Sequence, residues 1–102
     1  HLAIVHDGSK YQIYLDGSPV TTSGTTPLYN SQQLTIGARG RTVSITPADS
    51  YFNGKIDEVG IWNTNLSASQ ISEIYSATSA YKTKDLTEIS GSNLKYWLRM
   101  GD

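Results

Sequence analysis

The sequence lacks cysteine, an excess of charge of one sign and any long apolar run. The absence of cysteine excludes disulfide bonds and thiolate metal sites, although it does not distinguish cytoplasmic from exported proteins. The net charge is −1, and the scattered Lys and Arg form no cluster for a nucleic acid or an anionic membrane. Since no stretch approaches the roughly 20 apolar residues of a membrane span, we expect no membrane insertion.

The length of 102 residues allows at most one domain with a modest core. The chain starts without methionine, inside a strand-like run, so we expect it to be a piece of a longer protein.

The first half of the sequence reads as short strands separated by turns. Asp7-Gly8 separates His1–His6 from Tyr11–Asp16, and this arrangement predicts a β-hairpin. In the second strand Tyr11, Ile13 and Leu15 alternate with more polar residues, as in an antiparallel sheet with one wet face.

Two further segments complete this half. Residues 18–32 are rich in Ser, Thr, Gly and Pro and read as an irregular connection, with Val20 and Leu28 as anchors. Leu34–Gly37 reads as the next strand, and residues 39–50 as a loop with a short edge strand at 42–45.

The second half contains a strand that leads into a helix. Lys55–Trp62 reads as the strand, with Trp62 in the core. Ser67 to Gln70 form a capping box after Leu66, which predicts the helix start. The helical spacing of the following apolar residues predicts one buried stripe. Its members are Ile71, Ile74 and Tyr75. Residues 76–92 read as polar and irregular, and Leu94–Met100 as a last strand.

Three motifs carry a resemblance to a known family. They are HLAIVHDGSKYQIYLDG, LTIG and FNGKIDEVGIWNTNLSASQISEIY, in this order. The chain resembles the C-terminal half of a laminin-G-like, concanavalin A-like jelly roll of the lectin/glucanase superfamily. The resemblance implies an all-β, antiparallel β-sandwich with one short helix after the closing strand. Because such domains carry further strands upstream, half of a sandwich is expected here.

The resemblance also implies a division of the chain. Residues 1–80 would be the C-terminal half of the sandwich and residues 81–92 a linker. The ending NLKYWLRMGD, residues 93–102, resembles the opening strand of such a domain. It is therefore either the closing strand of this domain or the first strand of a next repeat.

Asp57 is the first residue with candidate chemistry. In a regular strand it shares a face with Val59 and Ile61, where a carboxylate needs partners. One interpretation is a structural Asp that accepts backbone amides or pairs with Arg. The other follows from the resemblance, which implies a weak structural Ca²⁺ bound by Asp57 and Asp102.

A catalytic interpretation of Asp57 and Glu58 fails on geometry, because neighbouring strand residues point to opposite faces and cannot share a cleft. His6 beside Asp7 has no nucleophile near it in the sequence. We therefore predict that the chain is not an enzyme.

Several loop residues have the chemistry to bind a glycan by stacking and hydrogen bonding, although they can equally be ordinary loop residues. They are Tyr29, Asn30, Arg39, Arg41, Tyr51 and Asn53. The leading hypothesis is a non-catalytic carbohydrate-binding or adhesion module of a larger extracellular, cell-surface or virion protein.

The alternative is a structural or assembly module of a bacteriophage or cell-surface particle, which contacts neighbouring protein subunits and binds no ligand. An accessory domain of a glycan-degrading enzyme is a third possibility. An unpaired sheet edge favours the assembly hypothesis, because such an edge invites pairing with another chain.

Overall fold

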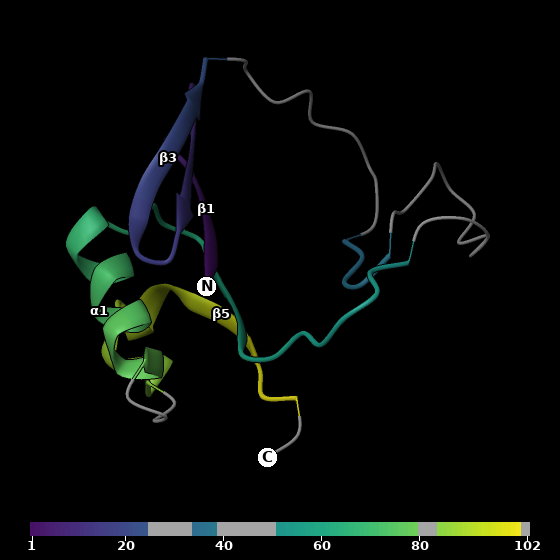
Figure 1. The fold of residues 1–102 in the computed structure, drawn as a ribbon. Helices are drawn as coiled ribbons and strands as arrows, with labels where there is room; N and C mark the ends of the chain where they lie inside the picture. The colour runs from purple at the N-terminus through teal and green to yellow at the C-terminus, as the bar shows by residue number, and fades with distance from the viewer. Residues whose placement is uncertain (25–33, 39–50, 80–83, 101–102) are drawn as a thin grey trace.

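The computed structural model describes residues 1–24, 34–38, 51–79 and 84–100. Within these ranges the chain forms a three-stranded and a two-stranded antiparallel sheet with a helix packed beside them (Figure 1). In chain order the elements are β1 (Leu2–His6), β2 (Tyr11–Leu15), β3 (Ser18–Ser23), β4 (Val59–Trp62), α1 (Ala68–Ser79), the 3₁₀ helices η1 (Leu86–Glu88) and η2 (Gly91–Asn93), and β5 (Leu94–Leu98). This architecture confirms the predicted all-β fold with one short α-helix.

The predicted hairpin is present as β1 and β2. Leu2 lies opposite Leu15, and His6 lies opposite Tyr11. The turn is closed by Asp7, whose Oδ1 accepts hydrogen bonds from the backbone amides of Ser9 at 2.9 Å and Lys10 at 2.8 Å. Because the carboxylate binds the free backbone amides of the turn, it stabilises the turn and with it the register of the two strands.

The chain continues into a third strand where the sequence predicted an irregular connection. Asp16 and Gly17 both have positive φ, 50° and 75°, and together form a two-residue turn. Left-handed residues at both turn positions match the twist of a hairpin, so the chain pairs again as β3. The prediction was therefore wrong for Ser18–Ser23. Val20 is exposed and is not an anchor, and Leu28 lies outside the described residues.

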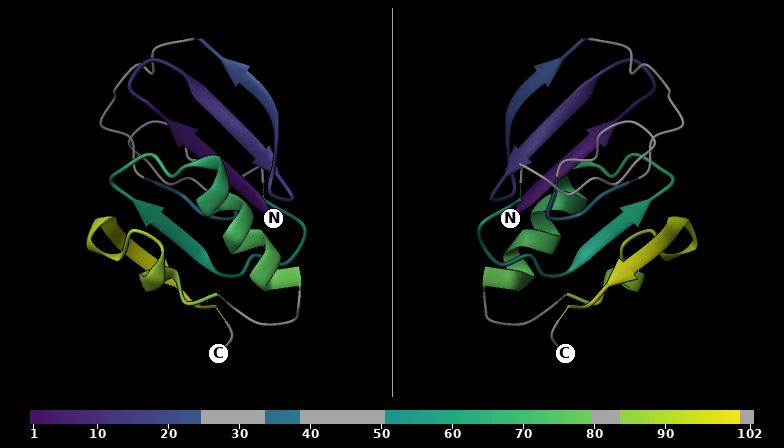
Figure 2. Two further views of the ribbon diagram at one scale, coloured as in Figure 1. Left: turned by 90° about the vertical axis from the view of Figure 1, so that its left-hand side faces the viewer. Right: turned by 90° about the vertical axis from the view of Figure 1, so that its right-hand side faces the viewer.

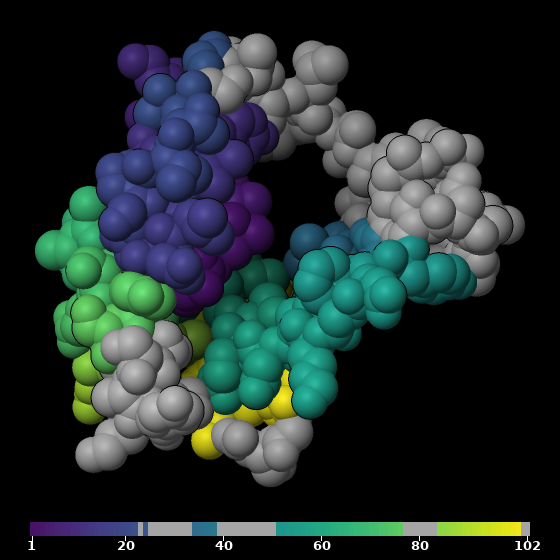
Figure 3. Space-filling view, viewed as in Figure 1, coloured from purple at the N-terminus to yellow at the C-terminus, as the bar shows by residue number. Residues whose placement is uncertain are grey.

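The two faces of the β1–β2–β3 sheet differ sharply. Helix α1 lies against one face, where Tyr14 is buried (Figures 1 and 2). The opposite face, called the inner face below, is apolar and open. It carries Leu2, Ile4 and Leu15, which are 63%, 61% and 52% exposed. Figure 3 shows a hollow between this sheet and the teal chain around residues 51–58.

The strand predicted at Leu34–Gly37 is replaced by a bend and an isolated bridge. Gly37 has a φ of 77°, and the Thr35 hydroxyl donates to the carbonyl oxygen of Ala38 at 2.9 Å. This local turn prevents an extended strand. Ala38 then pairs with Tyr51, and the amide of Phe52 donates to the carbonyl oxygen of Gly37 at 2.9 Å.

The strand predicted from Lys55 begins only at Val59. Glu58 has a φ of 53°, which interrupts the extended backbone and its alternation of faces. The side chain of Asp57 accepts the Glu58 amide at 2.9 Å and supports this unusual conformation. Asp57 is consequently exposed rather than on an apolar strand face.

Helix α1 begins as the sequence predicted. The amide of Gln70 donates to the Ser67 hydroxyl at 3.2 Å, and the Gln70 side chain accepts the Ser67 amide at 2.9 Å. Ile71 and Ile74 are buried on the predicted stripe, and Tyr75 is half-buried. None of the described helices is long and apolar enough to cross a membrane.

The main core lies between α1 and the β4–β5 sheet. Ile74 packs with Leu86 and Ile89, each of which is 3% exposed. Trp62, Leu66, Leu94 and Trp97 surround this cluster. Residues 86–93 are therefore packed 3₁₀ turns rather than an irregular polar segment, and β5 pairs antiparallel with β4. The predicted division into 1–80, 81–92 and 93–102 stays a prediction.

Candidate functional site

Two of the predicted ligand residues lie together on a short exposed segment. The bridge from Ala38 to Tyr51 and the adjacent hydrogen bond from Phe52 to Gly37 hold the backbone in place. The side chain of Tyr51 is 63% exposed, and Asn53 is exposed two residues later. An exposed aromatic ring beside an amide can stack on the apolar face of a sugar and hydrogen-bond its hydroxyls.

The other four predicted ligand residues, Tyr29, Asn30, Arg39 and Arg41, lie outside the described residues. The structure therefore brings together Tyr51 and Asn53 alone, and the predicted rim stays a prediction for the remainder.

The predicted calcium ligands are described in part. Asp57 offers one exposed carboxylate whose Oδ1 already accepts the Glu58 amide, and Asp102 lies outside the described residues. Among the residues that the structure describes, no three His, Cys, Asp or Glu side chains group closely enough to hold a metal. Since calcium takes six to eight oxygen ligands, the described residues do not by themselves fit the ion. The site at Asp57 and Asp102 stays a prediction.

Glu58 takes part in a cluster that the sequence did not predict. Its Oε2 accepts a hydrogen bond from the indole N–H of Trp97, and its Oε1 lies 3.7 Å from Nε of Arg99. The guanidinium of Arg99 lies 5.1 Å from the Trp97 ring centroid, within range of a cation–π interaction. No local pattern predicts the cluster, because its members come from segments about forty residues apart.

This cluster separates the two neighbouring acids. Glu58 is mostly buried against β5, whereas Asp57 faces solvent. The pair does not offer the two converging carboxyl groups that glycoside hydrolysis requires.

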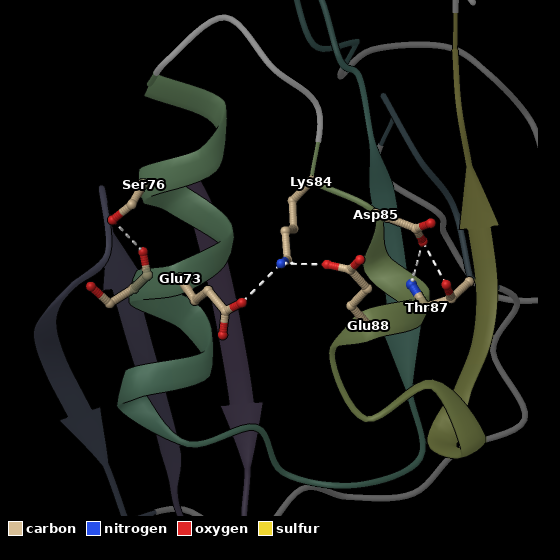
Figure 4. Close-up of polar contacts among 7 residues, drawn as sticks. Glu73, Ser76, Lys84, Asp85, Thr87 and Glu88 are labelled. Carbon is tan, nitrogen blue, oxygen red and sulfur yellow. Dashed lines mark hydrogen bonds and ion pairs between the residues drawn. The ribbon is translucent and has the colours of Figure 1, made fainter.

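A second polar cluster fixes α1 to the segment that follows it (Figure 4). The ammonium of Lys84 lies 2.8 Å from Oε1 of Glu73 on α1 and 2.6 Å from Oε2 of Glu88 on η1. The hydrogen bonds to Glu73 and Glu88 raise the pKa of Lys84 above its ordinary value. Asp85 caps η1 by accepting from the hydroxyl and amide of Thr87, and these bonds lower the pKa of its carboxyl. The role of both groups is structural.

The comparison with family models identifies the fold. Residues 1–72 match the model of the concanavalin A-like lectin/glucanases superfamily, in its laminin G-type branch. This match covers more than half of the chain, and the chain therefore belongs to that family. The antiparallel sheets and the helix agree with a β-sandwich of this type.

A solved structure supports the assignment. The chain is similar to an S-layer domain-containing protein from Clostridium thermocellum, with 27% sequence identity and a TM-score of 0.61. The similarity covers 74% of this chain but 38% of the other, so the chain spans less than half the length of that relative. No curated protein matches the chain.

Proposed function

We propose that the chain is part of a non-catalytic carbohydrate-binding or adhesion module of a larger extracellular or cell-surface protein. The observation that carries this proposal is the exposed Tyr51, whose backbone is held by the bridge to Ala38, with the exposed Asn53 two residues later. The ring offers a flat apolar surface, and the amide offers both a donor and an acceptor. Membership in a lectin-containing superfamily supports the same function.

The position of the acids supports a role without catalysis. The Asp57 carboxylate accepts a hydrogen bond from a backbone amide. The Glu58 carboxylate accepts one from Trp97 and forms an ion pair with Arg99. Binding by such a module needs a preformed surface and no proton transfer. The segment with Tyr51 and Asn53 is such a surface within the described part of the chain.

The similar proteins support a location at a cell surface or outside the cell. The relative of known structure is named as an S-layer domain-containing protein, and concanavalin A-like domains suit extracellular recognition. A virion surface protein is the other setting that the fold allows. The calcium ion predicted at Asp57 and Asp102 belongs to this proposal as a weak structural ion.

A second function is favoured by the inner face. Leu2, Ile4 and Leu15 form an exposed apolar surface. Contiguous surfaces of this kind commonly mark sites of contact with another protein segment. If neighbouring subunits cover this face and the Tyr51 segment, the module assembles a particle and binds no glycan.

The test is binding of the chain to an array of immobilised glycans, with Tyr51→Ala and Asn53→Ala as variants. The matched control is Tyr96→Ala on β5, because Tyr96 is 64% exposed, almost the same as Tyr51. We expect Tyr51→Ala to weaken binding about tenfold, since an aromatic contact contributes on the order of 1 kcal/mol beyond its buried area. Equal binding by Tyr51→Ala and the Tyr96→Ala control would contradict the assignment of this segment.

A further inference from the structure

A notch of about 250 Å³ lies on the opposite side of the sheet from the inner face. Its floor is the helix-side face of β1, β2 and β3, and its walls are the β1–β2 turn and the residues that lead into α1. Gln12 lies opposite Val5 on β1 and Thr22 on β3, so these three floor residues come from neighbouring strands and share a face. Asn65 and Leu66 form the facing wall.

One polar group in the notch is already fixed in orientation. The side-chain amide of Gln12 donates to the carbonyl oxygens of Ile13 at 2.9 Å and Thr21 at 2.6 Å. Because both bonds use its nitrogen, the Gln12 Oε1 is held in one direction and keeps its capacity to accept. A preorganised acceptor loses little entropy when it binds a ligand hydroxyl.

The hydroxyl of Tyr14 is a second polar group beside the notch. Tyr14 is 9% exposed and lines the notch. Among the hydrogen bonds of the described residues, none involves its hydroxyl. Although the ring is buried, the hydroxyl is not one of the fully buried polar atoms that lack a partner, so it can exchange bound water for a ligand.

Two side chains in the walls of the notch add hydrogen-bond donors that are not used within the described part of the chain. Within the described part of the chain, the ammonium of Lys10 and the side-chain amide of Asn65 make no hydrogen bond. Leu66 and Val5 supply apolar surface between these groups. A surface that alternates acceptors, donors and small apolar patches matches the surface of a sugar ring.

The charge of the notch favours a neutral ligand. Asp7 and Lys10 both line it, and their charges balance. The Asp7 carboxylate also accepts three hydrogen bonds within its own turn, from the amides of Ser9 and Lys10 and from the Ser9 hydroxyl. An anionic ligand would therefore face a fixed negative group at the rim.

We propose that this notch binds one neutral pyranose ring. The proposal rests on the carbohydrate-binding function above and adds to it a site separate from Tyr51 and Asn53. The volume lies below the range of about 300–1,000 Å³ of pockets for drug-sized ligands, which suits a single sugar unit rather than an oligosaccharide.

The test is a titration of the isotope-labelled full chain, followed by amide chemical shifts, with the methyl glycosides of glucose, galactose, mannose and N-acetylglucosamine. At least one glycoside is expected to shift the amides of Lys10, Gln12 and Asn65 in a saturable way. Tyr14→Phe should weaken this binding about fivefold, the loss expected for one hydrogen bond. Asn65→Ala should weaken it to a similar extent, whereas Asn63→Ala, an exposed residue outside the notch, should leave it unchanged.

The outcomes separate this site from the proposed function. Shifts at Tyr51 and Asn53 with none in the notch would overturn the notch and support the function. Shifts in the notch alone would support the notch and remove Tyr51 from the function. If none of the four glycosides gives saturable shifts, both the notch and the proposed function are overturned. If the notch shifts are the same in Tyr14→Phe and Asn65→Ala as in the wild type, the notch alone is overturned.

Discussion

The indole N–H of Trp62 donates a hydrogen bond to the carbonyl oxygen of Ile89 at 2.8 Å. This contact joins β4 to the segment between η1 and η2, 27 residues further along the chain. Ile89 is almost completely buried, so its carbonyl group has little access to water. The bond therefore fixes the segment between η1 and η2 against the hydrophobic core between α1 and the β4–β5 sheet.

Replacement of the indole donor should destabilise the fold. Trp62→Phe keeps an aromatic ring but removes the N–H and part of the packed volume, and leaves a buried carbonyl oxygen unpaired. We expect the free energy of unfolding to fall by about 2 kcal/mol, as measured by urea denaturation. The exposed Tyr96→Phe serves as control and should change it by less than about 0.5 kcal/mol. Equal stabilities of Trp62→Phe and the wild type would show that the contact is not structural.

Gly60 is required by packing rather than by its backbone angles. A Cβ at this position would lie 2.5 Å from the Trp62 ring and 2.8 Å from the Leu86 side chain. Gly60→Ala should therefore cost roughly 1–3 kcal/mol through overpacking, visible as a lower thermal midpoint. At Gly91 the nearest atom would be 3.8 Å away, and Gly91→Ala should be tolerated. A tolerated Gly60→Ala would contradict the described packing of β4.

Acid should destabilise the fold in part through two turn aspartates. Hydrogen bonds within their turns lower the pKa of Asp7 and of Asp85 in the folded state. A lowered folded pKa contributes stability above the unfolded pKa, and that stability is lost as the pH falls through the folded value. We expect the thermal midpoint to decrease below about pH 4. The Asp7→Asn, Asp85→Asn double variant should show a shallower decrease, and an unchanged pH profile would refute this origin.

The exposed inner face should make the chain self-associate. Ile4 and Leu15 are exposed apolar residues on one sheet face, and burial of such surface drives association. Sedimentation analysis of the wild type should show a mass that rises with concentration. Ile4→Lys should shift the population toward monomer, whereas Ser72→Lys, on the exposed side of α1, should have no effect. A wild type that stays monomeric at all concentrations would argue against a packing role for this face.

Local sequence signals were sufficient for some elements. Asp7-Gly8 and the capping box at Ser67 are self-contained, because the groups that hold them lie within three residues of each other. Glu58 shows the limit of this reasoning. It has a positive φ, and its side chain accepts a hydrogen bond from Trp97 on β5, a partner that no local pattern reveals. Leu86 and Ile89 are isolated apolar residues in a polar stretch, and their burial depends on the distant Trp62.

The same distinction applies to the binding residues. Tyr51 and Asn53 are two positions apart, so the sequence alone placed them on one segment. The notch combines residues from β1, β2, β3 and the start of α1. Tyr14 alternates with the apolar residues Ile13 and Leu15 in the sequence of β2, and only the position of α1 shows that the face of Tyr14 is the covered one.

The most direct test of the account is an experimental structure of the chain within its native assembly. The account predicts that further strands cover Leu2, Ile4 and Leu15 and complete a sandwich, while Tyr51, Asn53 and the notch stay open to solvent. A structure in which neighbouring subunits bury the Tyr51 segment and fill the notch would contradict glycan recognition and identify an assembly module.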